Sequence, residues 1–301
     1  MTLKFLTSFH YFRNFDYDAL VEEAGDEPMM IFADSGAFSA LSLGAEVTIE
    51  DYAEWLLRWK HHFSVYASLD VIGDHVGTMS NQRRLEQEFG LNPIPVFHVG
   101  SDLKDLEALC EEYPYIAFGG MVSFSKHNLG PWLLKCFRIT EKHGTRVHGF
   151  GQTRHAYLMD FPFFSVDSSS WVAGQKFGSQ RLWDPQRSKF VTVNVGDRSS
   201  CYKHGELIRS YGFDPSDISE SEKWSRHVSI PLSLQTFTLY EAFLRKRWSA
   251  QRPVDEGLNI YLAVVREQPG LFIEAAQRFH YFLAVDKVDV PFFLNRTGDP
   301  S

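Results

Sequence analysis

Four short motifs of carboxylate, serine and glycine residues each follow an apolar run in this sequence, and their residue types suit catalysis. The motifs are DSGAF from Asp34, SLD ending at Asp70, GGMV from Gly119 and SVDSSSW around Asp167. Two carboxylates in different surroundings can divide nucleophilic attack and proton transfer between them. The motifs therefore predict acid–base chemistry at one shared site.

The first two motifs have the features of a pocket for a flat ligand. Asp34 is followed by the small residues Ser35 and Gly36, so a planar group can approach its carboxylate, and Phe38 offers a face for stacking. The carboxylate of Asp70 can accept paired N–H groups, such as the N1–H and amino group of a guanine. We therefore expect a base-binding pocket.

The later motifs add a histidine, exposed backbone groups and a second candidate carboxylate. His98 ends the next strand-like run, and Gly119 and Gly120 present backbone N–H and C=O groups without side chains in the way. Asp167 lies among serine hydroxyls that can hold it ionised as a nucleophile. These hydroxyls belong to Ser165, Ser168, Ser169 and Ser170.

The elements that position these residues alternate along the chain. The apolar runs before the motifs are too short for helices and are typical of buried strands, and amphipathic stretches lie between them. This alternation predicts an α/β fold, a TIM (β/α)8 barrel, with the motifs at the carboxyl ends of its strands, where barrel enzymes place their active sites. The expected strands are 3–9, 29–34, 65–70, 93–98, 115–119, 146–150, 163–167 and 190–195.

The whole chain, 1–301, is predicted to be a single domain, with a barrel over about 1–230 and a helical C-terminal extension over about 231–301. Its 44% apolar residues suffice for a full core. The stretch 168–189 is expected to be a long loop after the last carboxylate motif. The best helical patterns lie at 48–63, 102–113, 233–248 and 271–285.

Composition limits the protein's class. The three cysteines are far apart and odd in number, which argues against a disulfide framework, and Cys110 and Cys136 have the pattern of core residues. No signal-peptide pattern or membrane span is evident, so we expect a cytoplasmic protein, in the host cytoplasm if it is viral. The formal net charge of −8 argues mildly against general coating of nucleic acid, although a local basic groove remains compatible with it.

The order of the motifs resembles the tRNA-guanine transglycosylase family, TIM barrels that exchange a guanine in a polynucleotide for a 7-deazaguanine. The resemblance covers about residues 29–175. It implies that Asp34 is the general acid/base, that Asp70 recognises the base, and that Asp167 is the nucleophile. The expected reaction proceeds through a covalent glycosyl-aspartate after the target guanosine has been extruded from its strand.

The motifs and the family resemblance together predict which residues bind the substrate. The sequence departs from the family in two of the motifs, with Ala37 in place of a glycine and His98 in place of a glutamine. The expected substrate-binding residues are Ser35, Gly36, Phe38, Asp70, His98, Gly119, Gly120, His148 and Gly149.

Two further departures bear on the substrate. The family's CxCxxC zinc cluster has no counterpart here beyond Cys201 with His204, so no structural zinc and no other cofactor are expected. The motifs VFHVG, HGFG and SVDSSSW look closer to the phage and bacterial paralogues that insert 7-deazaguanines, such as preQ0, into DNA. The resemblance therefore favours DNA over tRNA, and a partner protein that opens the duplex is a possible requirement.

Two basic stretches are candidates for contacting the nucleic-acid backbone. Lys176 and Arg181 follow the nucleophile motif, and Arg245, Lys246 and Arg247 lie beside a tryptophan near the end of a helix. The second stretch is equally compatible with an ordinary solvated helix face.

Three other functions stay open: a tRNA-guanine transglycosylase, a barrel hydrolase of nucleosides or glycosides, and a catalytically silent nucleic-acid-binding relative.

Overall fold

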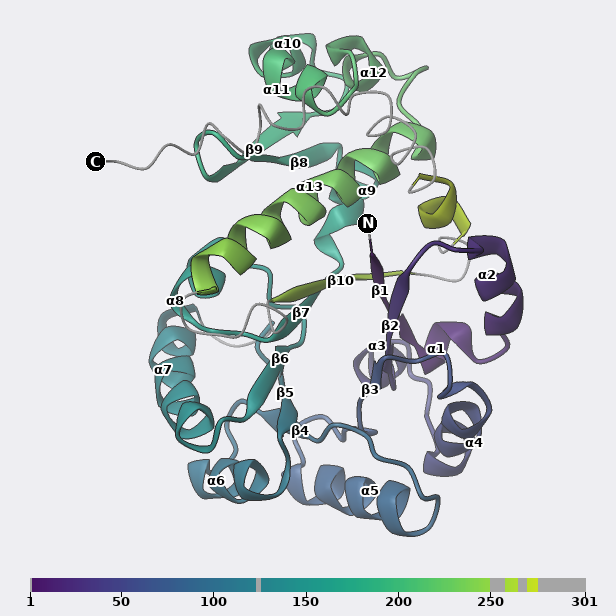
Figure 1. Cartoon of the computed structure of the whole chain (residues 1–301), viewed down its shortest axis with the longest axis vertical. Helices are drawn as coiled ribbons and strands as arrows, with labels where there is room; N and C mark the ends of the chain where they lie inside the picture. The colour runs from purple at the N-terminus through teal and green to yellow at the C-terminus, as the bar shows by residue number, and fades with distance from the viewer. Residues whose placement is uncertain (1, 123–125, 250–257, 265–269, 276–301) are drawn as a thin grey trace.

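The computed structural model describes residues 2–122, 126–249, 258–264 and 270–275. It is an α/β fold in which an eight-stranded, all-parallel sheet curls around its own interior (Figure 1). The strands, in their order across the sheet, are β3 (Val65–Tyr66), β2 (Met29–Asp34), β1 (Leu3–Ser8), β10 (Asn259–Ala263), β7 (Ser165–Ser168), β6 (Arg146–Gly149), β5 (Tyr115–Gly119) and β4 (Val96–His98).

The two outer strands of the sheet, β3 and β4, approach each other without forming a full ladder. One parallel bridge joins Ala67 to Ile94 beyond the strand ends. It comprises the hydrogen bonds from Ser68 N–H to Ile94 C=O at 2.9 Å and from Ile94 N–H to Tyr66 C=O at 2.9 Å. The fold is therefore compatible with a TIM-like barrel, although its β-ladder is not closed.

Seven of the expected strands lie in this sheet, but the expected eighth was wrong. Residues 189–194 form β9 (Lys189–Asn194), which pairs antiparallel with β8 (Ser179–Asp184) in a separate hairpin. The position between β1 and β7 is instead taken by β10, from the part of the chain predicted to be helical and outside the barrel. The five-residue β10 is buried or half-buried throughout, so it lacks the alternation that marks a strand in sequence.

The loop expected over 168–189 is likewise corrected, because it contains a short helix and β8. Most helices cover the outside of the sheet, as Figure 1 shows. The helices are α1 (Phe9–Phe12), α2 (Tyr17–Ala24), α3 (Ala37–Ser42), α4 (Ile49–Trp59), α5 (His75–Gln87), α6 (Leu103–Glu112), α7 (Lys126–His143), α8 (His155–Asp160), the 3₁₀ turn η1 (Ser170–Val172), α9 (Ala173–Phe177), α10 (Arg198–Lys203), α11 (Gly205–Ser210), α12 (Pro215–Ser219) and α13 (Arg226–Trp248).

The expected amphipathic helices are present where the structure describes them. α4 begins after Thr48, whose hydroxyl accepts the Asp51 N–H, and α6 begins after the capping carboxylate of Asp102. Residues 233–248 lie within α13. Residues 270–275 are helical, and the rest of the helix expected over 271–285 lies outside the described residues.

Aromatic and aliphatic side chains fill the interior of the curled sheet. Phe32 of β2 lies 4.3 Å, between ring centroids, from His148 of β6 and 5.4 Å from Tyr261 of β10. These strands are not all neighbours, so their side chains meet across the interior. Outside the sheet, the helices bury a second core that includes Cys110 and Cys136, which confirms that both cysteines are core residues.

The hairpin of β8 and β9 and the helices α10 to α12 form a small lobe beyond α13 (Figure 1). The lobe has its own apolar core, which includes Leu182, Val193, Cys201 and Ile208. α13 links the lobe to the sheet, because Trp183 of β8 is fully buried against aromatic residues of this helix.

Helix α5 fixes the two segments that carry Asp70 and His98. Asn81 Nδ2 donates a hydrogen bond to the Leu69 carbonyl at 3.0 Å, directly before Asp70. The buried Gln82 donates through Nε2 to the Pro93 carbonyl at 2.9 Å, at the start of the segment that leads into β4. One helix thereby holds both segments in place relative to each other.

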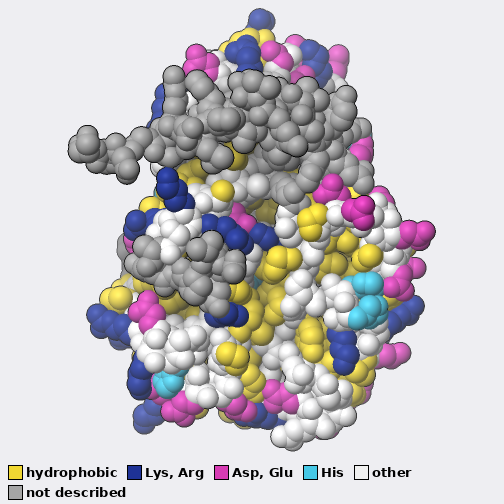
Figure 2. Space-filling model, viewed as in Figure 1, with side chains coloured by type: hydrophobic (Ala, Val, Ile, Leu, Met, Phe, Trp, Pro, Cys, Tyr) yellow, Lys and Arg dark blue, Asp and Glu magenta, His cyan; other side chains and the backbone are white. Residues whose placement is uncertain are grey.

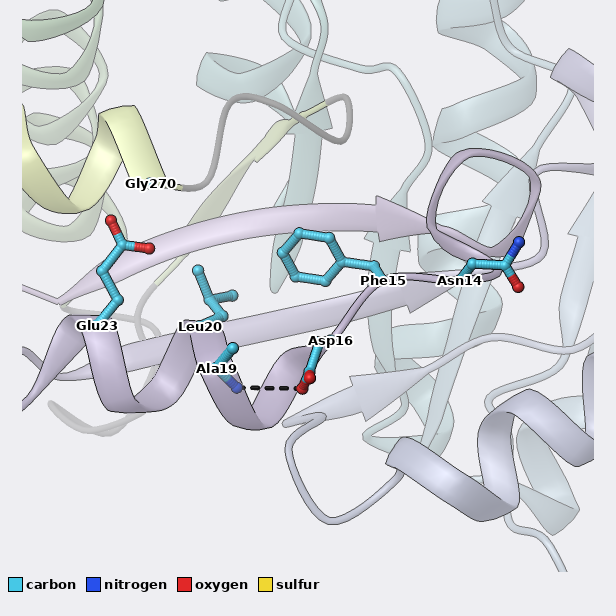
Figure 3. A pocket seen from close by; sticks show the side chains of 7 residues that line it. All are labelled: Asn14, Phe15, Asp16, Ala19, Leu20, Glu23 and Gly270. Carbon is cyan, nitrogen blue, oxygen red and sulfur yellow. Dashed lines mark hydrogen bonds between the residues drawn. The ribbon is translucent and has the colours of Figure 1, made fainter.

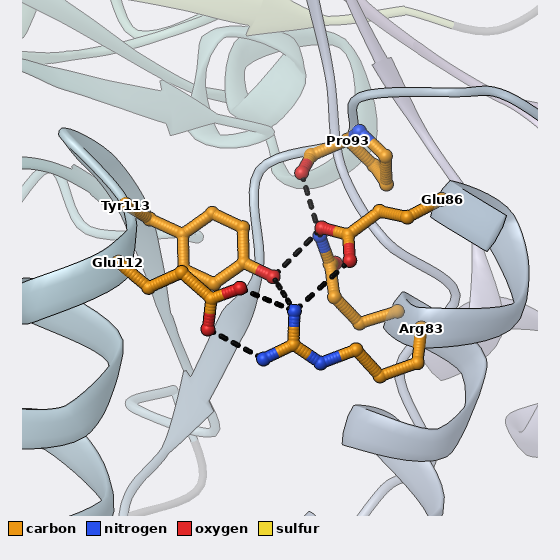
Figure 4. A network of polar contacts seen from close by, with 6 residues as sticks. Arg83, Glu86, Pro93, Glu112 and Tyr113 are labelled. Carbon is orange, nitrogen blue, oxygen red and sulfur yellow. Dashed lines mark hydrogen bonds and ion pairs between the residues drawn. The ribbon is translucent and has the colours of Figure 1, made fainter.

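The next turn of α5 is tied to α6 by a polar network (Figure 4). Arg83 forms a bidentate ion pair with Glu112 and donates to the Tyr113 hydroxyl at 2.9 Å. Glu86 accepts hydrogen bonds from Arg83 at 3.1 Å and from the Tyr113 hydroxyl at 2.7 Å. The network lies partly in solvent, so its contribution to stability is smaller than that of the buried Gln82 bond.

Acidic and basic side chains are interspersed along the edge of the face shown in Figure 2. Among the described residues, no helix is both long enough and apolar enough to cross a membrane.

The two parts of the α5 contact are predicted to differ in their effect on stability. Gln82→Ala should lower the free energy of unfolding by about 1–3 kcal/mol, because it leaves the buried Pro93 carbonyl unpaired. Arg83→Ala, the matched change at a half-buried ion pair, should cost less than about 1 kcal/mol. Urea denaturation of both variants measures the difference, and an equal or reversed order would contradict this account.

Candidate active site

The structure brings three of the expected aspartates together at the carboxyl end of the sheet. Asp34 ends β2, Asp70 follows β3, and Asp167 lies in β7. The charges of Asp70 and Asp167 both act on the Asp34 carboxyl group. Among the described residues, no Lys or Arg side chain forms an ion pair with any of the three. The site therefore concentrates negative charge without a neutralising cation from these side chains.

This arrangement shifts the pKa of Asp34. Burial, and next the nearby charge of Asp70, raise the pKa of Asp34 to about 7. The Gly36 N–H donates to Asp34 Oδ2 at 3.0 Å, which offsets part of this rise by favouring the charged form. A carboxyl group with a pKa near neutrality can both release and accept a proton, which is what a general acid/base requires.

Gly36 has a packing role as well as the expected role of leaving the ligand room. Its φ angle is +70°, and a Cβ atom there would lie 2.8 Å from the Cβ of His10. Only glycine fits this turn without moving the segment after β1. The small residue after Asp34 is thus required by the backbone itself.

Asp70 is held at both of its oxygens. The Ser35 hydroxyl donates to Oδ1 at 3.1 Å, and His98 Nε2 lies 3.1 Å from Oδ2. The expected pocket residues Ser35, Asp70 and His98 therefore form one connected group. Each carboxylate oxygen has a second lone pair, so both can still accept a hydrogen bond from a ligand.

His98 is buried and contacts Asp70 on one side and β5 on the other. A Cβ atom on Gly119 would lie 2.8 Å from His98 Cδ2, so glycine is the residue that lets the ring fit. His98 Nε2 faces Asp70, whereas Nδ1 is buried without a hydrogen-bond partner among the described residues. Gly120 follows with φ +76°, at the turn where β5 ends.

Asp167 is held by a backbone group and not by the serine hydroxyls that the sequence suggested. The Gly151 N–H donates to Asp167 Oδ1 at 2.7 Å. Ser165 instead bonds His148, and Ser168 bonds Ser170 at 2.7 Å. The expectation about the hydroxyls was therefore wrong, because these side chains find partners of their own.

The HGFG motif places Gly151 where it can reach the nucleophile candidate. A Cβ atom on Gly149 would lie 2.7 Å from the Phe163 ring, and Gly151 has φ +61°. His148 Nε2 is 3.5 Å from Asp167 Oδ1, which is an ion-pair separation without hydrogen-bond geometry. The paired glycines mark this turn in the sequence, but no residue type marks the backbone donor that they position.

Phe38 lies in α3, three residues after Ser35, and its side chain is 58% exposed. A side chain this exposed can be reached by a ligand that enters from solvent, and its stacking role stays a prediction.

The two cations of the first basic stretch, Lys176 and Arg181, differ in their exposure to solvent. Lys176 is exposed in α9, next to the site strand β7 in sequence. Arg181 lies in β8 with its guanidinium 4.1 Å from the centroid of the Phe190 ring. Burial lowers the pKa of Arg181. Lys176 is therefore the more accessible cation of this pair.

In the second basic stretch, two of the three cations bind the protein's own backbone. Arg245 donates to the Leu258 carbonyl at 2.9 Å and to Asn259 Oδ1 at 2.6 Å, and Arg247 donates to the Met159 carbonyl at 3.2 Å. Lys246 is exposed. These contacts fix the end of α13 to β10 and α8, so they support the structural interpretation of this stretch more than a phosphate site.

Two groups of side chains outside the site have metal-ligand types within reach of one another. One group comprises Asp18 of α2 with His61 and His62, which follow α4. The second group comprises Glu107, Glu111 and His143. Glu107 already pairs with Lys142 and His143. Neither group includes a carboxylate of the candidate active site.

A surface pocket of about 630 Å³ lies beside α2 (Figure 3). None of the expected site residues lines it. Its lining residues are Asn14, Phe15, Asp16, Ala19, Leu20, Glu23 and Gly270. The pocket is therefore separate from the carboxylate cluster.

Comparison of the sequence with protein-family models and with curated proteins found no match.

Asp34 is predicted to make stability depend on pH. The unfolded chain loses the Asp34 proton near pH 4, whereas the folded protein keeps it until about pH 7, so ionisation progressively destabilises the wild type across this window. Asp34→Asn removes that cost. The variant's stability relative to wild type should rise by about 1–4 kcal/mol from pH 4 to 7 and then level off.

Denaturation of both proteins at a series of pH values measures this difference. Asp26→Asn, a change at an exposed loop carboxylate, is the control and should give a flat difference. A flat difference for Asp34→Asn as well would show that Asp34 is not held protonated.

Proposed function

We propose that this protein is a base-exchange transglycosylase that replaces a guanine in a nucleic acid with a 7-deazaguanine. The observation that carries the proposal is that two carboxylates in different surroundings lie at the same end of the sheet. Asp34 has its pKa raised to about 7, and Asp167 accepts a short backbone hydrogen bond. Such a pair suits a reaction that needs a proton carrier beside a nucleophile.

In the first step, one Asp167 oxygen attacks C1′ of the target nucleoside as the bond from C1′ to N9 breaks. The electron pair of that bond moves to the guanine, which takes the proton of Asp34 and leaves. The products are a glycosyl-aspartate ester and a neutral base. Asp34 is then ionised and ready to accept a proton.

In the second step, the incoming 7-deazaguanine gives its N9 proton to Asp34 as N9 attacks C1′. The ester bond to Asp167 breaks, and its electron pair returns to the carboxylate. Two inversions at C1′ give net retention, and the acid/base group ends as it began. The exchange consumes no cofactor in this scheme.

Asp70 is the residue best suited to recognise the base. Ser35 and His98 fix its two oxygens at 3.1 Å each, and this presets the direction of the remaining lone pairs. The N1–H and amino group of a guanine present two parallel donors that match them. A fixed carboxylate loses less conformational entropy on binding than a mobile one.

DNA is the proposed polynucleotide, and this choice rests on the motif resemblance. A tRNA substrate is the second candidate, with the same chemistry at the pocket. A third is hydrolysis of a nucleoside or glycoside, in which water takes the place of the incoming base. The exposed Phe38, three residues after Ser35, favours a large ligand over a small enclosed one.

The test is incorporation of labelled guanine or preQ0 into DNA and, in parallel, into unmodified tRNA. Wild type should label DNA, and Asp167→Ala should lower the rate by at least about a thousandfold because it removes the nucleophile. Asp26→Ala, a change at an exposed carboxylate far from the motifs, is the matched control and should keep the wild-type rate.

Each other outcome points to a different conclusion. Labelling of tRNA alone would replace DNA as the substrate. Release of base from free nucleosides, with no labelling of either polymer, would favour the hydrolase. Full activity of Asp167→Ala would contradict the assignment of the nucleophile.

A further inference from the structure

A chain of buried and half-buried polar groups leads from the interior of the sheet to Asp167. The Tyr115 hydroxyl lies 2.6 Å from Ser165 Oγ, and Ser165 Oγ lies 2.6 Å from His148 Nδ1. The other ring nitrogen of His148, Nε2, lies 3.5 Å from Asp167 Oδ1. Ser165 and His148 are direct register partners on β7 and β6, so the sheet itself sets this contact.

The surroundings of His148 keep its ring neutral. The side chain is fully buried and lies 4.3 Å from the Phe32 ring and 4.6 Å from the Phe150 ring, measured between centroids. This burial lowers the pKa of His148. A neutral imidazole carries its proton on one nitrogen only, so the neighbours of the ring decide which nitrogen that is.

The donors and acceptors of this chain fit together only when each hydroxyl donates toward His148. Burial raises the pKa of Tyr115, so its hydroxyl stays protonated and can donate to Ser165. Ser165 then donates to His148 Nδ1, which leaves the proton on Nε2, facing the Asp167 carboxylate. In the opposite direction, the Nε2 lone pair would face that carboxylate at 3.5 Å, which is repulsive.

We infer that His148 is a positioning residue for Asp167, fixed by Tyr115 and Ser165 as the tautomer with its proton on Nε2. This inference rests on the proposed function, in which Asp167 is the nucleophile. The Gly151 N–H and the His148 N–H then both face Oδ1. Oδ2, which has no hydrogen-bond donor among the described residues, is the oxygen that attacks C1′.

The same donors act in both chemical steps. In the glycosyl ester, Oδ1 becomes the carbonyl oxygen; it keeps the hydrogen bond from the Gly151 N–H, and the His148 N–H still faces it from 3.5 Å. When the ester bond breaks, negative charge returns to the carboxylate, and the two N–H dipoles that already face it stabilise that charge. Loss of the His148 proton from this position should therefore slow turnover without weakening substrate binding.

The tautomer can be measured without any assay of activity. Long-range ¹H–¹⁵N NMR of the full-length protein, labelled in its histidines, distinguishes a protonated ring nitrogen from an unprotonated one. His148→Phe identifies the His148 signals by their loss. We expect the proton on Nε2 in wild type, and a mixture of tautomers in Ser165→Ala, because that change removes the donor to Nδ1.

Exchange kinetics provide the second readout. Ser165→Ala should lower kcat by roughly tenfold, less than the loss of a full hydrogen bond to a charged group because His148 Nε2 lies 3.5 Å from Asp167 Oδ1, with KM unchanged. Ser165→Thr keeps the hydroxyl and should restore most of the rate. Ser168→Ala is the matched control, because it removes a buried hydroxyl of the same strand that bonds Ser170 and not His148.

The outcomes separate this inference from the proposed function. A proton on Nδ1 of His148 would overturn the inference whether or not the protein exchanges bases. A wild-type kcat for Ser165→Ala, in a protein that Asp167→Ala inactivates, would overturn the inference and leave the function standing. Absence of exchange by wild type would contradict the function, and the NMR measurement would still decide the tautomer.

Discussion

Burial of Asp34 close to two other carboxylates, Asp70 and Asp167, is the constraint on which the site depends. The parallel sheet places Asp34, Asp70 and Asp167 at the same end, and no described Lys or Arg side chain pairs with them. Three ionised groups in this partly buried space would be costly, so the free energy is lowest when one of them keeps its proton. Asp34 takes that role because burial, together with the charges of Asp70 and Asp167, raises its pKa.

The scaffold responds to this charge with donors from the backbone, hydroxyls and histidines instead of with cations. Gly36 donates to Asp34 and Gly151 to Asp167, while Ser35 and His98 hold Asp70. Neutral donors direct each carboxylate without fixing it permanently in the ionised form. This leaves Asp34 able to exchange a proton near neutral pH, which the proposed reaction needs twice in every cycle. The turns that supply the backbone donors need glycine, which explains why glycines accompany the aspartates in the motifs.

Much of this arrangement could be predicted from the sequence, because each aspartate follows an apolar run and parallel strands bring such ends together. The origin of the eighth strand could not. The NIYLA segment at 259–263 is short, buried or half-buried throughout and surrounded by sequence that was expected to be helical, whereas the alternating residues of β9 looked like a barrel strand and pair elsewhere. The donor to Asp167 was also missed, because a backbone N–H leaves no mark on residue type. Ser165 was assigned to the wrong partner, since only the strand register shows that it faces His148.

The most direct test of the account is to trap and map the covalent intermediate. The full-length protein is mixed with the polynucleotide that supports exchange, without an acceptor base, and quenched in denaturant before mass spectrometry. The account predicts a protein–nucleic acid adduct that has lost one guanine, is attached to Asp167, and disappears when a 7-deazaguanine is added before quenching. Exchange without an adduct, or an adduct on Asp34, would contradict the assignment of Asp167 as nucleophile and Asp34 as proton carrier.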